Sequence, residues 1–233
     1  MEYLENFGDI RQTGSCIHCG GATESKDHSP SLVLLDKPHP KHQPWAWSCE
    51  PCNRGFSLDE EYLACVLECA KTGSVRPEDQ QRDVVSRILR RQPRLTTMLE
   101  ASQVHLDGKT ALLADPERIQ SVVLKLARGH AAYELNEPQF EHPDQIAFVP
   151  LDSLVAKERE RFETPPPIDV LPEIGSRAMQ RVSAYTDGST EGWFTDWVEV
   201  QPGRYRYLAA AGYQITIRIV MSEYLACEVI WNG

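Results

Sequence analysis

Two short stretches decide how the first part of this chain folds: Cys16-Ile17-His18-Cys19 and Cys49-Glu50-Pro51-Cys52. A C-x-x-C turn presents two thiolates to one metal ion, and a second such turn completes the tetrahedral shell that Zn²⁺ prefers. Redox-active or core cysteines are the alternative, but the doubled spacing favours zinc. For His18, inside the first pair, the alternatives are an exposed spacer, which we expect, and a phosphate contact. We therefore expect a structural zinc site formed by Cys16, Cys19, Cys49 and Cys52.

The 29 residues between the two cysteine pairs are enough to form structure of their own. The apolar run at 31–35 predicts a short buried strand, and the aromatic run at 45–48 predicts a second strand that leads into the second pair. The prolines between these runs exclude regular structure there. Ser57 and Glu60 have the spacing of a capping box, which predicts the start of a helix that ends at Gly73. The expected order is strand, strand, helix.

The middle of the chain is predicted to be mainly helical. Residues 78–102 have the pattern of two helices broken at Pro93. Residues 104–111 predict a small hairpin about the turn Asp107-Gly108. Asp115, with a proline directly after it, predicts the start of another helix, and apolar residues recur at helical spacing beyond it.

The last part of the chain is predicted to be β structure. Residues 157–175 contain three successive prolines and are expected to be a connecting loop. Aromatic and β-branched runs separated by turn residues then predict an antiparallel meander. Its strands are expected at 193–200, 204–209, 214–221 and 224–231. The expected fold class is α+β, with three segments: a zinc-bound segment at 1–75, a mainly helical segment with a hairpin at 76–156, and a linker with the β region at 157–233.

The composition is typical of a folded protein that does not enter a membrane. Of the 233 residues, 41% are hydrophobic, which allows a sizeable core without disulfides. No apolar run reaches the about 18 residues that a membrane span needs, and no signal-peptide pattern is present. Three cysteines outside the two pairs lie in apolar surroundings typical of buried free thiols: Cys65, Cys69 and Cys227. We therefore expect a cytoplasmic protein.

The charges are distributed unevenly along the chain. The net charge of −10 disfavours a protein that holds nucleic acid through overall electrostatics. Only the middle of the chain is basic, since residues 76–131 carry 10 basic and 7 acidic side chains. Four arginines there fall largely along one side of a helix and its exit: Arg87, Arg90, Arg91 and Arg94. Two interpretations are open, a solvated helix face and a strip that contacts phosphates.

The motifs between residues 14 and 72 resemble those of the zinc-stapled HNH endonucleases. The resemblance consists of the two C-x-x-C pairs, Asp27-His28 with Pro30, and Asn53-Arg54-Gly55 directly after the second pair. Phe56-Ser57 and residues 59–64 make the chain especially similar to a bacterial branch of predicted nucleases. The family implies a ββα-metal finger, in which two strands and a helix hold one Mg²⁺ or Mn²⁺ ion against a scissile phosphate of DNA.

The resemblance implies catalytic roles for three residues, because phosphodiester hydrolysis needs an activated water and a Lewis acid on the phosphate. His28, with an ordinary pKa of about 6.5, can take a proton from water. Asp27 points to the other side of an extended backbone and offers a hard oxygen ligand, and Asn53 either offers a neutral oxygen ligand or orients His28. Arg54 is then a candidate for phosphate contact. The structural alternatives are an ordinary turn at Asp27-His28 and a left-handed backbone at Asn53.

Two positions depart from the family pattern. Pro44 stands where a central asparagine is usual, so the amide that braces the loop must come from elsewhere, with Gln43 and His42 as candidates. Gly55-Phe56 stand where many relatives have a lysine. Two functions therefore stay open: a metal-dependent DNA endonuclease, and a zinc-folded scaffold or regulatory module without turnover. In both, the carboxy-terminal region is a candidate surface for a homo-oligomer or a protein partner.

Overall fold

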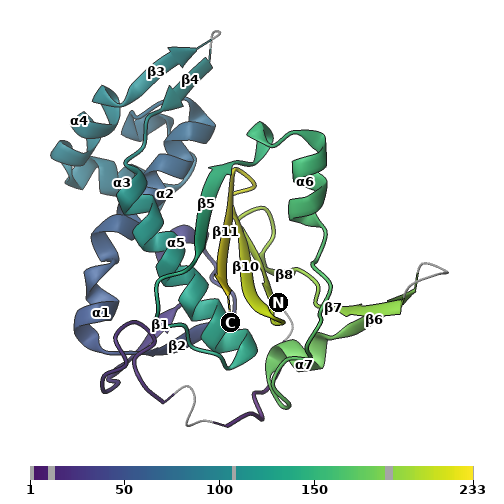
Figure 1. Ribbon diagram of the computed structural model, residues 1–233. Helices are drawn as coiled ribbons and strands as arrows, with labels where there is room; N and C mark the ends of the chain where they lie inside the picture. The colour runs from purple at the N-terminus through teal and green to yellow at the C-terminus, as the bar shows by residue number, and fades with distance from the viewer. Residues whose placement is uncertain (1–2, 10–13, 107–108, 187–190, 233) are drawn as a thin grey trace.

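The computed structural model describes residues 3–9, 14–106, 109–186 and 191–232 (Figure 1). Its elements in chain order are β1 (Ser25–His28), η2 (Leu32–Leu34), β2 (Trp45–Ser48), α1 (Glu50–Gly55), α2 (Ser57–Thr72), η3 (Pro77–Asp79), α3 (Asp83–Arg91), α4 (Pro93–Ala101), β3 (Gln103–Leu106), β4 (Lys109–Leu112), α5 (Pro116–His130), η4 (Ala131–Leu135), β5 (Gln145–Pro150), η5 (Leu151–Ser153), α6 (Ala156–Glu163), α7 (Arg177–Arg181), β6 (Ser183–Thr186), β7 (Glu191–Phe194), β8 (Val198–Gln201), β9 (Tyr205–Ala210), β10 (Gln214–Met221) and β11 (Leu225–Asn232). The fold class is α+β, as the sequence predicted.

A five-stranded antiparallel sheet forms the carboxy-terminal part of the molecule. Its strand order is β5-β11-β10-β9-β8, so the last four strands form a meander and β5 joins at one edge. In the register, Ile217 of β10 lies opposite Ala209 of β9 and Val229 of β11. Successive side chains of a strand point to opposite faces. Ile217 therefore packs into the main core, while Val220 packs into a smaller cluster on the other face.

Helix α5 connects the helical part of the molecule to the sheet. It lies against β10 and β11, and α2 packs on it as well (Figure 1). Its fully buried residues include Val122 and Leu126, which recur at helical spacing. The largest hydrophobic cluster extends from Leu34 through α2 and α5 to Trp231. The three segments predicted from the sequence therefore share one core.

The cysteine-rich segment forms a two-stranded hairpin followed by helices. β1 pairs antiparallel with β2, with Asp27 opposite Ala46 and His28 opposite Trp45. α1 follows β2 and is separated by one residue from α2. α2 ends at Gly73, whose φ of 70° is in the left-handed region that favours glycine at a helix end.

The chain directly after β1 lies close to α5 at Gly129. A Cβ atom added to Gly129 would lie 1.9 Å from Oγ of Ser29, the residue that follows β1. Ser29 is itself buried. Only glycine therefore allows α5 to pack this close to the end of β1.

Several elements agree with the sequence predictions. Four features are confirmed: the strand at 45–48, the helix end at Gly73, the helix break at Pro93 and the helix capped by Asp115. The Asp115 carboxylate accepts a hydrogen bond from the Glu117 N–H at 3.0 Å. β3 and β4 form the expected hairpin, whose predicted turn residues Asp107 and Gly108 lie outside the described residues.

Two predictions in the cysteine-rich segment are wrong. The stretch predicted at 31–35 contains the 3-10 turn η2 instead of a strand, because the Leu34 and Leu35 N–H groups donate to the carbonyls of Ser31 and Leu32 within the turn. Ser57 and Glu60 do not form a capping box, because Phe56 holds the N-cap position with helical backbone angles. The Glu60 side chain is used elsewhere, as described below.

Two predictions in the last segment are also wrong. The expected loop at 157–175 begins with α6, whose Ala, Lys, Glu and Arg residues favour helix and whose Phe162 is buried beside Val220. The strand expected at 193–200 is divided, since β7 pairs with β6 in a separate hairpin and β8 begins at Val198. Residues 195–197, between β7 and β8, belong to neither strand.

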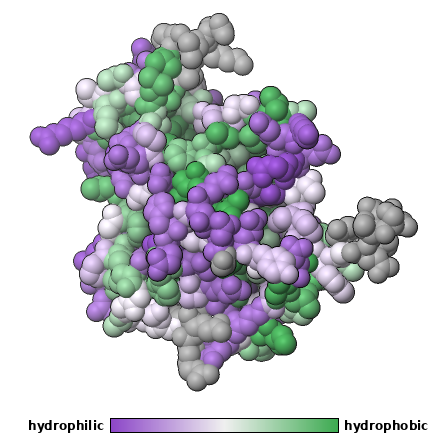
Figure 2. All heavy atoms as spheres, in the orientation of Figure 1, coloured by the Kyte–Doolittle hydropathy of each residue, from purple (hydrophilic) through white to green (hydrophobic). Residues whose placement is uncertain are grey.

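Hydrophilic residues form a band across the middle of the face shown in Figure 2, and hydrophobic residues on this face appear in small groups.

Among the residues that the structure describes, none of the helices combines the length and the apolar character needed to span a lipid bilayer.

The close approach at Gly129 gives a test of the packing of α5 on the hairpin. Gly129→Ala is expected to lower the free energy of unfolding by about 1–3 kcal/mol, because the added methyl group collides with Ser29. Gly55→Ala is the matched control, since a Cβ there meets nothing within 4 Å and alanine favours helix. Urea denaturation of both variants measures the difference. Equal stability of the two variants would contradict this packing.

Candidate functional site

The four cysteines predicted to bind zinc come together in space. The Sγ atoms of Cys16, Cys19, Cys49 and Cys52 all lie within 4.8 Å of one another. Sγ of Cys19 and Sγ of Cys49 are 3.8 Å apart. Four sulfur atoms placed tetrahedrally at about 2.3 Å from Zn²⁺ would be separated by roughly 3.8 Å. The cluster can therefore hold a metal ion such as zinc.

Backbone hydrogen bonds position both cysteine pairs. The Gly20 N–H donates to the Cys16 carbonyl at 2.8 Å and closes the first turn. The Ile17 N–H donates to the Trp47 carbonyl at 3.1 Å, which fastens that turn to β2. Cys49 is the N-cap of α1, and Cys52 lies in the first turn of the same helix. The second pair is thus fixed by a helix start and the first by the neighbouring strand.

The surroundings of Cys16 favour its thiolate form. Burial raises the pKa of this thiol, but hydrogen bonds from the backbone of Cys49, His18 and Cys19 and from the Ser48 hydroxyl outweigh burial and lower the pKa to about 6. The thiolate is the form that binds a metal ion. Cys16 is therefore a ready ligand at neutral pH.

Asp27 is buried, with 2% of its surface exposed, and both of its carboxylate oxygens have partners. Oδ1 lies 2.6 Å from Nζ of Lys125 on α5. Oδ2 lies 2.9 Å from Nε2 of His18. The prediction that His18 is an exposed spacer is wrong, because its side chain is buried where the ring reaches back to Asp27.

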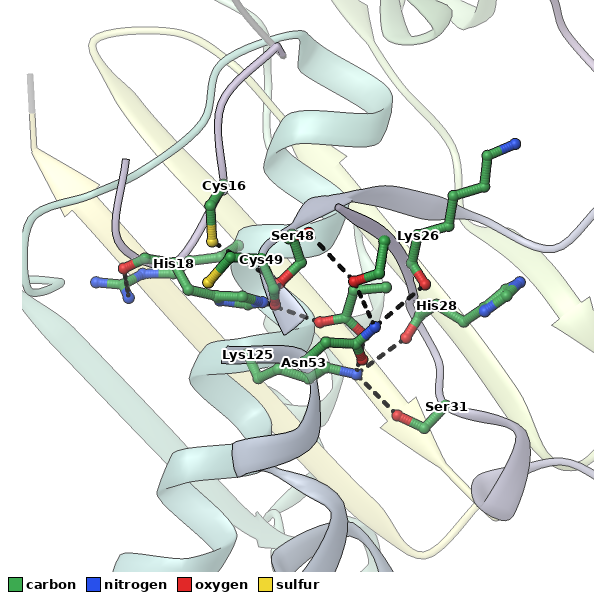
Figure 3. Close-up of polar contacts among 12 residues, drawn as sticks. Cys16, His18, Lys26, His28, Ser31, Ser48, Cys49, Asn53 and Lys125 are labelled. Atoms are coloured by element: carbon green, nitrogen blue, oxygen red, sulfur yellow. Dashed lines mark hydrogen bonds and ion pairs between the residues drawn. The ribbon is translucent and has the colours of Figure 1, made fainter. Parts of the chain in front are cut away.

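Lys125 is held by oxygen atoms from three other parts of the chain (Figure 3). Besides Asp27, its Nζ lies 2.6 Å from Oε1 of Glu60, 2.9 Å from Oγ of Ser31 and 3.1 Å from the carbonyl oxygen of His28. Only 2% of the Lys125 side chain is exposed. We call this arrangement the lysine cage: the Lys125 ammonium with the side-chain oxygens of Asp27, Ser31 and Glu60 and the His28 carbonyl.

The imidazole of His28 lies on the other side of β1 from the lysine cage. In Figure 3 it points away from Lys125 and Asn53. Burial lowers its pKa below the ordinary value; Asp27 opposes this effect, and the charges of Lys125 and Lys26 add to it. His28 is therefore neutral at pH 7 and able to accept a proton.

Asn53 lies on α1 directly after the last cysteine. Its Nδ2 donates to Oγ of Ser25 at 3.0 Å and to the carbonyl of Lys26 at 3.4 Å, so the side chain is turned toward β1. The alternative of a left-handed residue is wrong, because Asn53 has helical backbone and a negative φ.

The loop after β1 is braced without the central asparagine. The Pro44 carbonyl accepts a hydrogen bond from the Ser29 N–H at 3.0 Å. The Gln43 amide donates to the Pro30 carbonyl. Of the two candidates that the sequence offered, Gln43 therefore makes the bracing contact next to His28.

Asp27, His28 and Asn53 line one cleft of about 340 Å³. The remaining residues of its wall are Lys26, Ser31, Leu32, Val33, Ser57, Glu60, Glu61 and Lys125. The three predicted catalytic residues therefore share a cleft, although the His28 ring and the Asp27 carboxylate leave β1 in different directions. The cleft adjoins the cysteine cluster through α1, which carries both Cys52 and Asn53.

The arginines singled out in the sequence are exposed. Arg54 pairs with Glu50 at 2.5 Å. Arg87, Arg90, Arg91 and Arg94 lie on α3 and at the start of α4. Nη2 of Arg91 is 2.7 Å from Oε1 of Glu61, which belongs to the cleft wall. We call the four arginines of α3 and α4 the arginine strip; through Arg91 it starts at the rim of the cleft.

Sequence reasoning missed Lys125 and assigned Glu60 only a capping role. A signal for Lys125 was present, since residues 122–124 before it and residues 126–127 after it are all apolar. A lysine on a buried helix face needs a carboxylate partner. The identity of that partner depends on the tertiary fold.

Comparison of the chain with protein-family models, with curated proteins and with solved structures found no match. The geometry of the site is therefore the basis for a functional proposal.

Loss of one thiolate tests the metal centre. Cys16→Ser is expected to reduce bound zinc from about one ion per chain to nearly none and to destabilise the hairpin, because structural zinc contributes directly to folding. Cys69→Ala, a buried cysteine of α2 outside the cluster, is the control and should keep its zinc. Elemental analysis of both purified variants measures the metal. Full zinc content in Cys16→Ser would contradict the assignment.

Proposed function

We propose that this protein is a metal-dependent endonuclease of the HNH type that hydrolyses phosphodiester bonds of DNA. In this proposal, β1, β2 and α1 are a ββα-metal finger whose cysteine cluster holds structural zinc. The observation that carries it is the shared cleft of Asp27, His28 and Asn53 beside the four cysteines. These residue types in this order are the ones that the resemblance to HNH endonucleases implies.

The residues of the cleft suit the separate tasks of hydrolysis. His28 is neutral at pH 7 and can accept the proton of the attacking water. Asp27 and Asn53 offer hard oxygen atoms, the ligand type that Mg²⁺ and Mn²⁺ prefer, and Asp27 already binds a cation in the form of Lys125. A divalent ion held there would supply Lewis-acid stabilisation of the phosphate. Zinc would stay structural, because four thiolates leave no open position.

Basic and aromatic groups near the cleft support DNA as the substrate. The arginine strip continues from the cleft rim along α3. On β1, Nζ of Lys26 lies 4.0 Å from the ring centre of Trp45 on β2. Lysine and arginine attract phosphates, while aromatic rings can stack on unpaired bases. These lysine and arginine side chains give the surface beside the cleft a local positive charge, although the net charge of the whole chain is −10.

A second function, a zinc-folded binding module without turnover, is favoured by one specific observation. Both oxygens of Asp27 are paired inside the protein, with Lys125 and His18. A carboxylate that is satisfied in this way has less need of a metal ion. In this alternative the cleft binds a partner and does not cut it.

Cleavage of plasmid DNA with Mg²⁺ or Mn²⁺ tests the first function. The zinc-loaded wild type is expected to cut, and His28→Ala is expected to cut about 100-fold or more slowly, because the general base is lost. His142→Ala is the matched control, since His142 lies outside the cleft and contacts the Pro143 carbonyl. It should cut at the wild-type rate.

The outcomes of this assay separate the two functions. Equal cutting by His28→Ala and wild type, with equal zinc content, would rule out His28 as the base. Absence of cutting by the wild type with every divalent ion tried would favour the binding module.

A further inference from the structure

One face of the β1–β2 hairpin carries aromatic and basic side chains. In the register of the two strands, Lys26 lies opposite Trp47 and His28 lies opposite Trp45. Residues that lie opposite each other in an antiparallel pair project from the same side, as do residues two apart on one strand. The four side chains therefore share one face of the hairpin. We call it the tryptophan face: Lys26, His28, Trp45 and Trp47.

The tryptophan face is turned toward solvent. The residues that alternate with its members, Asp27 and Ala46, are buried on the opposite face of the hairpin. Lys26 is exposed, and the other three members are partly exposed. Figure 3 shows that the side chains of Lys26 and His28 both extend from β1 away from Lys125. A ligand in solution can therefore reach this face.

The two indole rings suit a flat aromatic ligand. The ring centres of Trp45 and Trp47 are 5.1 Å apart and the ring planes meet at 84°, so the rings do not stack on each other. Within the described chain, neither indole N–H has a hydrogen-bond partner. Nζ of Lys26 lies 4.0 Å from the ring centre of Trp45. A cation over an exposed ring is held weakly, so a second flat group can displace it.

The tryptophan face continues into the cleft of the proposed nuclease. Lys26 and His28 belong both to this face and to the cleft wall. The face carries one positive charge and no negative one, because burial lowers the pKa of His28 and leaves it neutral at pH 7. Positive charge attracts phosphates, and flat rings stack on bases. A nucleotide whose base stacks on Trp45 brings its phosphate to the side of the hairpin where His28 stands.

The chemistry of this face favours unpaired bases over a closed duplex. In a duplex the flat faces of the bases are covered by the stack, and only the base edges are open in the grooves. Reading those edges mainly uses amide and guanidinium groups, and the tryptophan face has neither. Stacking on a protein ring needs a base that is free of the stack.

We propose that the tryptophan face binds unpaired DNA, with bases stacked on Trp45 and Trp47 and a phosphate held by Lys26, and that it directs the cleft to single-stranded or locally opened DNA. The identity of the nucleic acid rests on the proposed endonuclease function, to which this inference adds the class of DNA. A negatively supercoiled plasmid opens locally and therefore stays a substrate.

Binding of labelled oligonucleotides without added Mg²⁺ or Mn²⁺ tests the proposal, because binding is then measured apart from cutting. At one fixed salt concentration, the zinc-loaded wild type is expected to bind a single strand of about 20 nucleotides roughly tenfold or more tightly than the duplex of the same sequence. Trp45→Leu and Trp47→Leu are each expected to lower the single-strand affinity about tenfold and to change the duplex affinity little, because a stacking ring is lost. Fluorescence anisotropy measures both affinities.

Trp193→Leu is the matched control. Trp193 is 50% exposed on β7, in a hairpin on the other side of the molecule from β1 and β2 in Figure 1. Trp193→Leu should bind single strands like the wild type. Trp45→Phe keeps a ring that can stack, so it should recover most of the single-strand affinity that Trp45→Leu loses, at equal zinc content.

Three results would each overturn the proposal. The first is equal affinity of the wild type for single strand and duplex, a comparison that also decides the matter if a leucine variant fails to fold. The second is full single-strand affinity in folded Trp45→Leu and Trp47→Leu, and the third is an equal loss in Trp193→Leu. A wild type that binds single strands through these rings but cuts no DNA removes only the endonuclease function, so the two failures are distinguishable.

Discussion

A carboxylate removed from water needs a partner of opposite charge, and the partner of Asp27 determines how this molecule is assembled. Lys125 supplies the charge from α5, almost a hundred residues along the chain. The same helix packs on α2 and on the sheet, so one ion pair joins the hairpin to the main core. The absence of a side chain at Gly129 allows this contact, because a Cβ there would strike Ser29.

The sequence was sufficient wherever a feature depends on neighbours along the chain. The spacing of the four cysteines predicts their cluster, because a C-x-x-C turn is a local geometry, and their sulfur atoms do come together. The Asp115 cap and the left-handed Gly73 follow from backbone chemistry over a few residues. The α+β class also follows, since the C-terminal runs have clear strand composition.

The site was only partly predictable, because its key contacts join distant segments. Nothing near Asp27 in the sequence indicates that its carboxylate meets Lys125, or that Glu60 is turned inward instead of capping α2. The run at 31–35 is apolar like a strand, but its backbone hydrogen bonds are made locally, from the Leu34 and Leu35 N–H groups to the carbonyls of Ser31 and Leu32. The apolar composition of this run correctly predicted that it is buried, since Leu34 and Leu35 lie in the core, but it did not predict the turn conformation.

The two cation-binding groups of this segment differ in chemistry in a way that separates their tasks. Thiolates are soft ligands that close a tetrahedral shell, so the cysteine cluster suits an ion that holds structure. The lysine cage consists of hard oxygens around a cation that belongs to the protein itself. The Lys125 ammonium neutralises the oxygens, and the four thiolates remain for a metal ion such as zinc.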